Sequence, residues 1–266
     1  MKKESIIWIV AISLLVIAIG VLVYGYIRNA TEEVKNPVVT MEVENYGTVK
    51  IELYPEMAPN TVAHFIKKIE ENFYDGLTFH RTIPDFMIQG GDKEGTGRGQ
   101  SSYNLPGEFI ANGFKDNKLK HERWVISMAR ADYGSGLTNY SYNSASTQFF
   151  IMTEDTPSLD GYYTAFGKVI EGMDVVDQIA NTEVVYRTSE LKENEDVPKD
   201  SEGMDIASDR PVNPPVITKM TVDTFGVDYG DYETTVPFDY NKWLYSQYGI
   251  DVDNLNTESS DTNSEE

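Results

Sequence analysis

The chain contains no cysteine, which excludes disulfide bonds, a thiolate nucleophile and any metal site with cysteine ligands. Histidine is almost as scarce. His64, His80 and His121 are the only three, and their spacing matches neither a metal-binding pattern nor a Ser–His–Asp arrangement for hydrolysis. Acids outnumber bases by 43 to 22, which gives a net charge of −21. Because affinity for nucleic acid depends mainly on lysine and arginine contacts to phosphate, this balance argues against a nucleic-acid partner.

The histidines are therefore interpreted as structural residues. His64 falls within a segment of helical periodicity, and we expect it to be partly exposed. His80 directly precedes Arg81, and successive side chains of a strand point to opposite faces. We therefore expect His80 to be a hydrogen-bonding structural residue that faces away from Arg81, and not a catalytic base.

The N-terminal region has a run without charge from Ile6 to Ile27, preceded by Lys2 and Lys3. A helix of these 22 residues is long enough to cross a hydrocarbon core of about 30 Å. A cleavable signal peptide has an apolar core of only about 7–15 residues and a small-residue cleavage site, and neither is present. A buried core helix of this length, without polar interruption, is the weaker explanation. We predict a transmembrane anchor within residues 1–30, a cytoplasmic N-terminus, and the remainder of the chain outside the cell membrane.

Beyond a polar linker at residues 31–36, the hydrophobic pattern changes to alternation. Apolar and polar side chains alternate over residues 39–43 and again over 49–53 after a turn, which predicts a hairpin of half-buried strands. Pro59 suits the first turn of a helix, and helical periodicity then continues to Ile69. The order of hairpin, helix and strand does not match a parallel βαβ repeat, so antiparallel β-structure is favoured.

Glycines are concentrated between Gly90 and Gly99. The phosphate-loop pattern G-x-x-x-x-G-K-[ST] fails here because Thr96 follows Gly95 at the position where lysine is required. The better interpretation is a loop that allows a peptide backbone to approach closely along a groove.

The stretch from Phe79 to Asp92 places one permanently charged donor, Arg81, among apolar residues, with Gln89 close behind it. By itself this stretch is equally well explained by a strand with one buried, paired arginine. Three further blocks follow in the chain: Ser127–Ala131, Thr147–Ile151 and Leu159–Val169. In their order and residue types, the four blocks resemble the cyclophilin family of peptidyl-prolyl cis-trans isomerases over residues 37–226.

The resemblance implies a mainly-β fold, a closed eight-stranded antiparallel barrel capped by two helices. It implies proline-containing peptides or proteins as clients, no cofactor, no metal, and a monomer. The residues expected to be catalytic are Arg81, Phe86 and Gln89. The residues expected to bind substrate are Met87, Gly95, Ala129, Arg130, Ala131, Gln148, Phe150, Leu159 and Tyr163.

Three positions depart from the family pattern. Ser158 stands where many members have tryptophan, Tyr163 where many have histidine, and Arg130 where others have asparagine. The ring of Tyr163 still offers a flat wall to the expected groove. Arg130 is expected to contact the peptide through its backbone. None of the three changes removes the charged donor or the apolar pocket.

Several other segments flank this pattern. Residues 132–146 form a loop longer than is usual in the family, either a recognition surface beside the groove or merely a long surface loop. A second helix is expected near residues 173–180, and the strand near 216–222 should pair with the first strand. Residues 189–209 read as a mobile acidic insertion. Residues 227–266 form an acidic and partly disordered tail, whose aromatic residues either dock on the barrel or bind a partner.

Three functions remain open from the sequence. The first is a membrane-tethered isomerase that assists the folding of exported or cell-surface proteins. The second is a catalytically slow module that binds proline peptides. The third is a tethered scaffold with a vestigial groove. The intact arginine and pocket residues favour the isomerase.

Overall fold

The computed structural model describes residues 8, 12–23, 35–99, 101–187, 190–191, 196–199 and 203–249. The chain divides into two units, Met1–Lys35 and Asn36–Glu266. In the first unit, residues 12–23 are helical. A search of the described residues finds no helix with the length and apolar character needed to cross a membrane. The predicted anchor, residues 6–27, lies partly outside the described residues.

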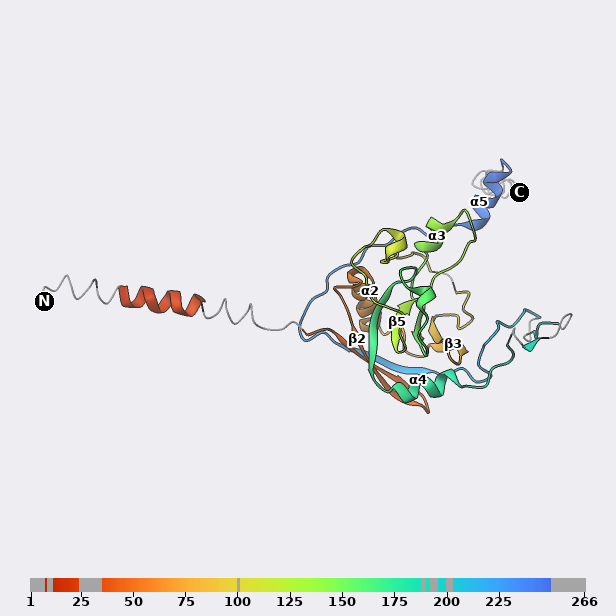
Figure 1. Cartoon of the computed structure of the whole chain (residues 1–266), viewed down its shortest axis with the longest axis horizontal. Coiled ribbons are helices and arrows are strands. Elements are labelled where there is room, and N and C mark those ends of the chain that lie inside the picture. Colours follow the sequence, from red (N-terminus) through yellow and green to blue (C-terminus); the bar gives the residue numbers. More distant parts are fainter. Residues whose placement is uncertain are drawn as a thin grey trace, which may run out of the picture. The chain divides into compact units, whose positions relative to one another are not determined.

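The second unit is built around one antiparallel sheet of eight strands (Figure 1). Its spatial order is β3-β4-β6-β5-β7-β2-β1-β8. The strand bounds are β1 Val38–Val43, β2 Gly47–Leu53, β3 Thr78–Ile83, β4 Met87–Asp92, β5 Val125–Met128, β6 Phe149–Met152, β7 Ala165–Glu171 and β8 Ile217–Asp223. The predicted first hairpin is confirmed by the β1–β2 pairing. Its turn requires a positive φ of 63° at Asn45 and 127° at Gly47, conformations that asparagine and glycine tolerate best.

Two helices pack against this sheet. Helix α2, Pro59–Glu70, has its proline in the first turn and buries the predicted apolar face that includes Phe65 and Ile69. Helix α4, Met173–Ala180, buries Val176 and Ile179 in the same core. The shorter helices are α3 Thr138–Tyr142, α5 Tyr240–Gln247, and the 3-10 turns η1 Ile110–Asn112 and η2 Pro157–Leu159.

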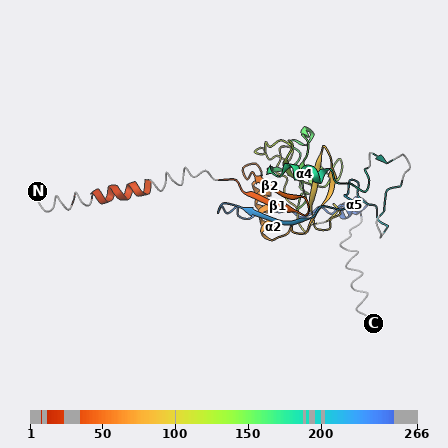
Figure 2. The same ribbon diagram turned by 90° about the horizontal axis from the view of Figure 1, so that it is seen from below.

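The closure of the sheet differs from the expected closed barrel. β8 pairs with β1 as predicted, and the two strands run side by side in Figure 2. The edge strands β3 and β8, however, meet at an isolated bridge between Thr78 and Val216. Pro214 and Pro215 precede this bridge and have no N–H to donate to a ladder. Further along β3, the N–H of Thr82 donates to Asp209 in the insertion (2.9 Å).

The C-terminal tail contacts the rest of the second unit at Tyr232, Glu233, Thr235 and Phe238. Residues 229–241, here called the strap, pass over helix α2. Within the strap, Tyr232 makes an edge-to-face contact with His64 at 4.8 Å between ring centroids. Thr235 exchanges two backbone hydrogen bonds with Asn104, both 2.8 Å long. Tyr232 and Phe238 of the strap therefore dock on the fold, whereas Tyr245 and Tyr248 farther along the tail are exposed.

This packing corrects the expectation for His64. The side chain is fully buried, and its Nε2 lies 2.9 Å from the Tyr103 hydroxyl. Burial lowers the pKa of His64 to about 4, with a further contribution from Lys68. Sequence periodicity predicts the face of a helix that meets the core, but it does not show that a segment some 170 residues later covers the opposite face.

Candidate active site

Arg81 lies on β3 opposite Gln89 on β4. The register between the two strands shifts between Phe79 and Arg81, so the strict alternation of side chains is interrupted there. As a result His80 and Arg81 both line one cavity of about 430 Å³, and the prediction that His80 faces away from Arg81 is wrong. His80 is buried, and neither ring nitrogen has a hydrogen-bond partner among the described residues, so its predicted hydrogen-bonding role is not seen either. Burial lowers the pKa of His80 to about 4.

An apolar cluster that is separate from the main core begins on β4, the strand paired with the Arg81 strand. Phe86 is held in the turn after β3 by Asp85, whose φ of 54° is left-handed. Phe150 lies on β6, which pairs with β4, and the Tyr163 ring meets it edge-on at 5.8 Å. The cluster contains the six predicted apolar residues Phe86, Met87, Ala129, Phe150, Leu159 and Tyr163.

The polar residues predicted to hold a peptide are also adjacent. Nε2 of Gln89 donates to Oε1 of Gln148 at 2.9 Å, and the Ala129 N–H donates to the Gln148 carbonyl, also at 2.9 Å. Arg130 has a side-chain role in addition to its backbone. Its guanidinium lies over the Tyr163 ring at 4.3 Å and donates to the Tyr162 carbonyl, so it braces the pocket wall.

A second cavity, of about 710 Å³, continues from these residues. On one side it is lined by Gln89, Gln148 and residues 129–131, and on another by residues 237–241 of the strap. Gly95 lines neither of the two cavities. Gly97 and Arg98, which the sequence did not single out, line both of them.

The comparisons with known proteins agree with this geometry. Residues 38–222 match the family model described as "Cyclophilin type peptidyl-prolyl cis-trans isomerase/CLD". The chain belongs to the cyclophilin family. It is 41% identical over 143 residues to peptidyl-prolyl cis-trans isomerase B of Bacillus subtilis, an alignment covering 54% of this chain and 90% of that protein. It is 39% identical to a peptidyl-prolyl cis-trans isomerase of Synechococcus elongatus, covering 52% of this chain and 90% of that protein.

A solved structure supports the fold. The crystal structure of a Cryptosporidium parvum cyclophilin-type isomerase in the presence of the dipeptide Ala-Pro superimposes with a TM-score of 0.52. The sequences are 27% identical, and the match covers 70% of this chain and 98% of that one. Together with the relatives, it identifies the chain as a peptidyl-prolyl cis-trans isomerase.

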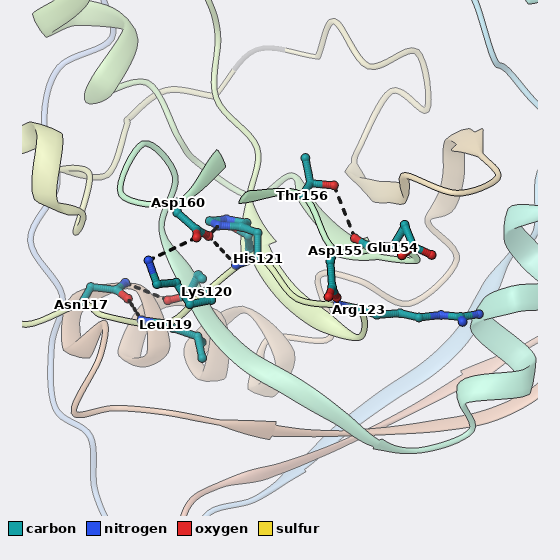
Figure 3. A network of polar contacts seen from close by, with 11 residues as sticks. Asn117, Leu119, Lys120, His121, Arg123, Glu154, Asp155, Thr156 and Asp160 are labelled. Atoms are coloured by element: carbon teal, nitrogen blue, oxygen red, sulfur yellow. Dashed lines mark hydrogen bonds and ion pairs between the residues drawn. The ribbon is translucent and has the colours of Figure 1, made fainter. Parts of the chain in front are cut away.

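In this cyclophilin, a buried polar network that the sequence did not reveal lies next to the apolar cluster. His121 stacks on Phe150 at 6.1 Å between ring centroids. Its Nδ1 lies 3.3 Å from Oδ1 of Asp160, and its Nε2 lies 3.1 Å from the Ser127 hydroxyl (Figure 3 shows Asp160 between Lys120 and His121). Burial lowers the pKa of His121, against the opposing effect of Asp160, so the ring is neutral at neutral pH. An ionised Asp160 can only accept, so Nδ1 donates to it and Nε2 accepts from Ser127.

The glycine-rich loop is organised by a carboxylate. Asp92, at the end of β4, is buried and accepts from the backbone N–H groups of Glu94, Thr96, Gly97 and Gly99. Burial raises the pKa of Asp92, but these hydrogen bonds outweigh that effect and hold it below its usual range. A ring of N–H donors that already holds a carboxylate is not a phosphate site. Its role is to shape the segment that carries Gly97 and Arg98.

Proposed function

We propose that Arg81 and the adjoining apolar pocket perform the isomerisation. An X–Pro amide must lose resonance to rotate, across a barrier of about 18–20 kcal/mol. At the transition state the C–N bond is twisted and the lone pair is localised on the proline nitrogen. A guanidinium aimed at that nitrogen stabilises the twisted state more than the planar one, which is the requirement for catalysis. The observation that carries the proposal is that the Arg81 guanidinium lines a cavity on β3, while β4, the strand paired with β3, carries Met87 of the apolar cluster.

The remaining residues divide the task of holding the peptide. Phe86, Met87 and Phe150 hold the proline ring, while Leu159 and Tyr163 form the outer wall. Gln89 and Gln148, which are hydrogen-bonded to each other, offer amide groups to an extended backbone. Neither covalent chemistry nor proton transfer is needed.

Energetically, a rate gain of about 10⁵ requires roughly 7 kcal/mol. One charge-assisted hydrogen bond from Arg81 supplies about 1.5–3 kcal/mol of this. The rest comes from orienting the ring and from excluding water around the twisting bond.

The test is substitution of Arg81 in the full chain. Arg81→Ala should lower kcat/KM for an X–Pro peptide by about 10²–10³, while peptide affinity changes far less. Arg81→Lys should retain little of the wild-type kcat/KM, because a flexible ammonium group does not reproduce the planar guanidinium. Phe86→Ala should weaken binding and turnover together. The measurements are a protease-free isomerisation assay and a peptide titration on the same variants. A wild-type protein that binds proline peptides without accelerating their exchange would favour the slow binding module.

We further propose that the isomerase acts as a monomer outside the cell membrane on exported or cell-surface clients, in assistance of folding. The support is the uncharged run of residues 6–27 and the lysines that precede it. Full-length protein should fractionate with membranes, retain residues 1–30, and be digested by protease added to intact cells. Recovery of a soluble form that starts near residue 30 would contradict the anchor, and light scattering of detergent-solubilised protein tests the monomer.

A further inference from the structure

The insertion between α4 and β8 brings a carboxylate to Arg81. The stem of the insertion is a pair of short segments, residues 183–187 and 209–212, joined by backbone hydrogen bonds such as Val185 N–H to the Arg210 carbonyl (2.8 Å). This stem adds to the free edge of β3 through the bond from Thr82 N–H to the Asp209 carbonyl (2.9 Å). An exposed strand edge next to the site is thereby covered.

Asp209 is held firmly at this edge. It is 8% exposed and has a φ of 62°, a left-handed conformation that aspartate tolerates better than most residues. Its Oδ1 accepts from Nη1 of Arg187 at 3.1 Å, and its Oδ2 accepts from the Ser208 hydroxyl at 2.9 Å. The same Nη1 of Arg187 also donates to the Thr82 carbonyl at 3.2 Å, which ties the carboxylate to β3 from a second direction.

The carboxylate oxygen on the Ser208 side faces the arginine of the active site. Oδ2 of Asp209 lies 3.7 Å from Nε of Arg81. This is the one ion pair that Arg81 makes within the described part of the chain. Since the contact is made at Nε, the two terminal amino groups of the Arg81 guanidinium remain available to donate to a peptide. The Arg81 side chain is 40% exposed, so without a fixed partner it would sample several rotamers.

We infer that Asp209 is a positioning residue for Arg81, and that the insertion supplies it. This inference rests on the proposed role of Arg81. An anion beside the guanidinium also weakens its positive potential, but that loss is small because the pair is solvent-screened and Arg187 shares the carboxylate. Orientation is the larger effect, since a donor must be aimed before the bond twists.

The experiment is a double-mutant cycle in the full chain. Asp209→Asn should lower kcat/KM by about 3- to 10-fold, with KM nearly unchanged. In an Arg81→Ala background the same change should have no effect, because nothing remains to be positioned. Asp196→Asn, which removes an exposed acid of the same insertion, is the matched control and should leave activity unchanged.

The outcomes separate cleanly. An equal loss in both backgrounds would show that Asp209 acts on the groove in another way and would overturn the inference, as would no loss at all. Full activity in Arg81→Ala alone would instead contradict the proposed role of Arg81. To distinguish lost positioning of Arg81 from a loosened stem, the Nε–H signal of Arg81 is followed by NMR in the wild type, in Asp209→Asn and in Asp209→Glu. A signal that does not respond to either substitution at Asp209 would also overturn the inference.

A different observation concerns the cavity of about 710 Å³ that the strap lines on one side. Phe238 of the strap stacks on Tyr140 at 4.0 Å and meets Tyr133 at 5.0 Å, so the strap is fixed to the long loop of residues 132–146. The cavity therefore has walls from the loop and from the strap, and the strap lies beyond the residues that match the family model.

The charges in this wall are unlike those of the chain as a whole. Arg98 and Arg130 both line the cavity, and neither is paired with a carboxylate in the part of the chain that the structure describes. The acid in the wall, Asp239, caps helix α5 by accepting from the Lys242 N–H at 2.8 Å. We propose that Arg98 and Arg130 give this part of the groove a preference for a carboxylate side chain on a client residue that flanks the proline.

Peptides of one length with glutamate, glutamine or lysine at each flanking position test this. At one position kcat/KM should be about 5-fold higher for glutamate than for lysine at low salt. The ratio should fall toward one in Arg98→Gln and in Phe238→Ala, and persist in Val236→Ala, a 90% exposed residue of the same strap. Equal turnover of glutamate and lysine peptides at every position would overturn the proposal, whereas absence of turnover for all peptides would contradict the isomerase function itself.

Discussion

The Ser127 hydroxyl lies 3.1 Å from Nε2 of His121, a distance at which a serine could be activated as a nucleophile. Asp160 on the other ring nitrogen completes the three residue types of a hydrolytic triad. Ser127, however, is completely buried, and the His121 ring stacks on Phe150 of the apolar cluster. The arrangement therefore supports a pocket wall and has no route to a substrate carbonyl.

We predict that Ser127 is chemically inert and structurally necessary. A serine-directed phosphonate should not label the folded protein, which mass spectrometry can check. Ser127→Ala should lower the free energy of unfolding by about 1–2 kcal/mol, because Nε2 of buried His121 loses its partner. Ser158→Ala, an exposed serine nearby, is the control and should have no such effect. Stoichiometric labelling at Ser127 would contradict this interpretation.

The stability of the fold should fall as pH is lowered below about 6.5. Burial lowers the pKa of His64 and His80 to about 4 and lowers that of His121. The folded-state pKa values are thus below the unfolded value of about 6.5, so in this window the unfolded chain binds more protons. Stability is fully present above pH 6.5 and is lost as pH falls toward 4.

Each of the three histidines should contribute a slope of up to about 1.4 kcal/mol per pH unit. The free energy of unfolding, measured by urea titration at pH 5, 6 and 7, gives the summed slope of the three histidines. His64→Phe removes one titrating group and should reduce the slope by about one proton. A free energy of unfolding that is constant between pH 7 and pH 5 would show that the histidines are solvated.

The strap should stabilise the barrel through Tyr232. Tyr232→Ala removes the ring that covers His64 and should cost about 1–2 kcal/mol, the scale of an aromatic pair plus its buried area. Tyr248, which is 76% exposed, provides a matched control, because Tyr248→Ala should leave the melting temperature unchanged. If the two variants melted together at the wild-type temperature, the strap would not be packed on α2 in solution.

Asp92 should be the residue on which the glycine-rich loop depends. Asp92→Asn replaces two acceptor oxygens by one oxygen and an NH₂ group that faces backbone N–H donors. The free energy of unfolding should fall by about 2–3 kcal/mol. Glu94→Gln changes an exposed acid of the same loop and should be neutral in the same urea titration. Equal stability of both variants would contradict the organising role of Asp92.

The sequence alone determined the local elements and the composition of the pocket. Residues 39–53 alternate between apolar and polar because one face of each strand is buried. After Pro59, apolar residues recur every three to four positions because one face of the helix is buried. Both patterns can be recognised within a short stretch of sequence. Arg81, Phe86 and Gln89 lie in one short stretch, so their proximity follows from chain connectivity. Phe150 could be associated with them through the family resemblance.

Only the tertiary structure decided the features that depend on distant segments. Because the register shifts between Phe79 and Arg81, His80 and Arg81 line the same cavity. A shift of register does not appear as a periodic pattern in the sequence. Asp209 reaches Arg81, and Tyr232 covers His64, across more than a hundred residues of chain. Such contacts arise where the edge of one strand or the outer face of one helix is left unsatisfied by its neighbours. Which later segment covers that surface is set by the packing of the whole fold and not by any local pattern.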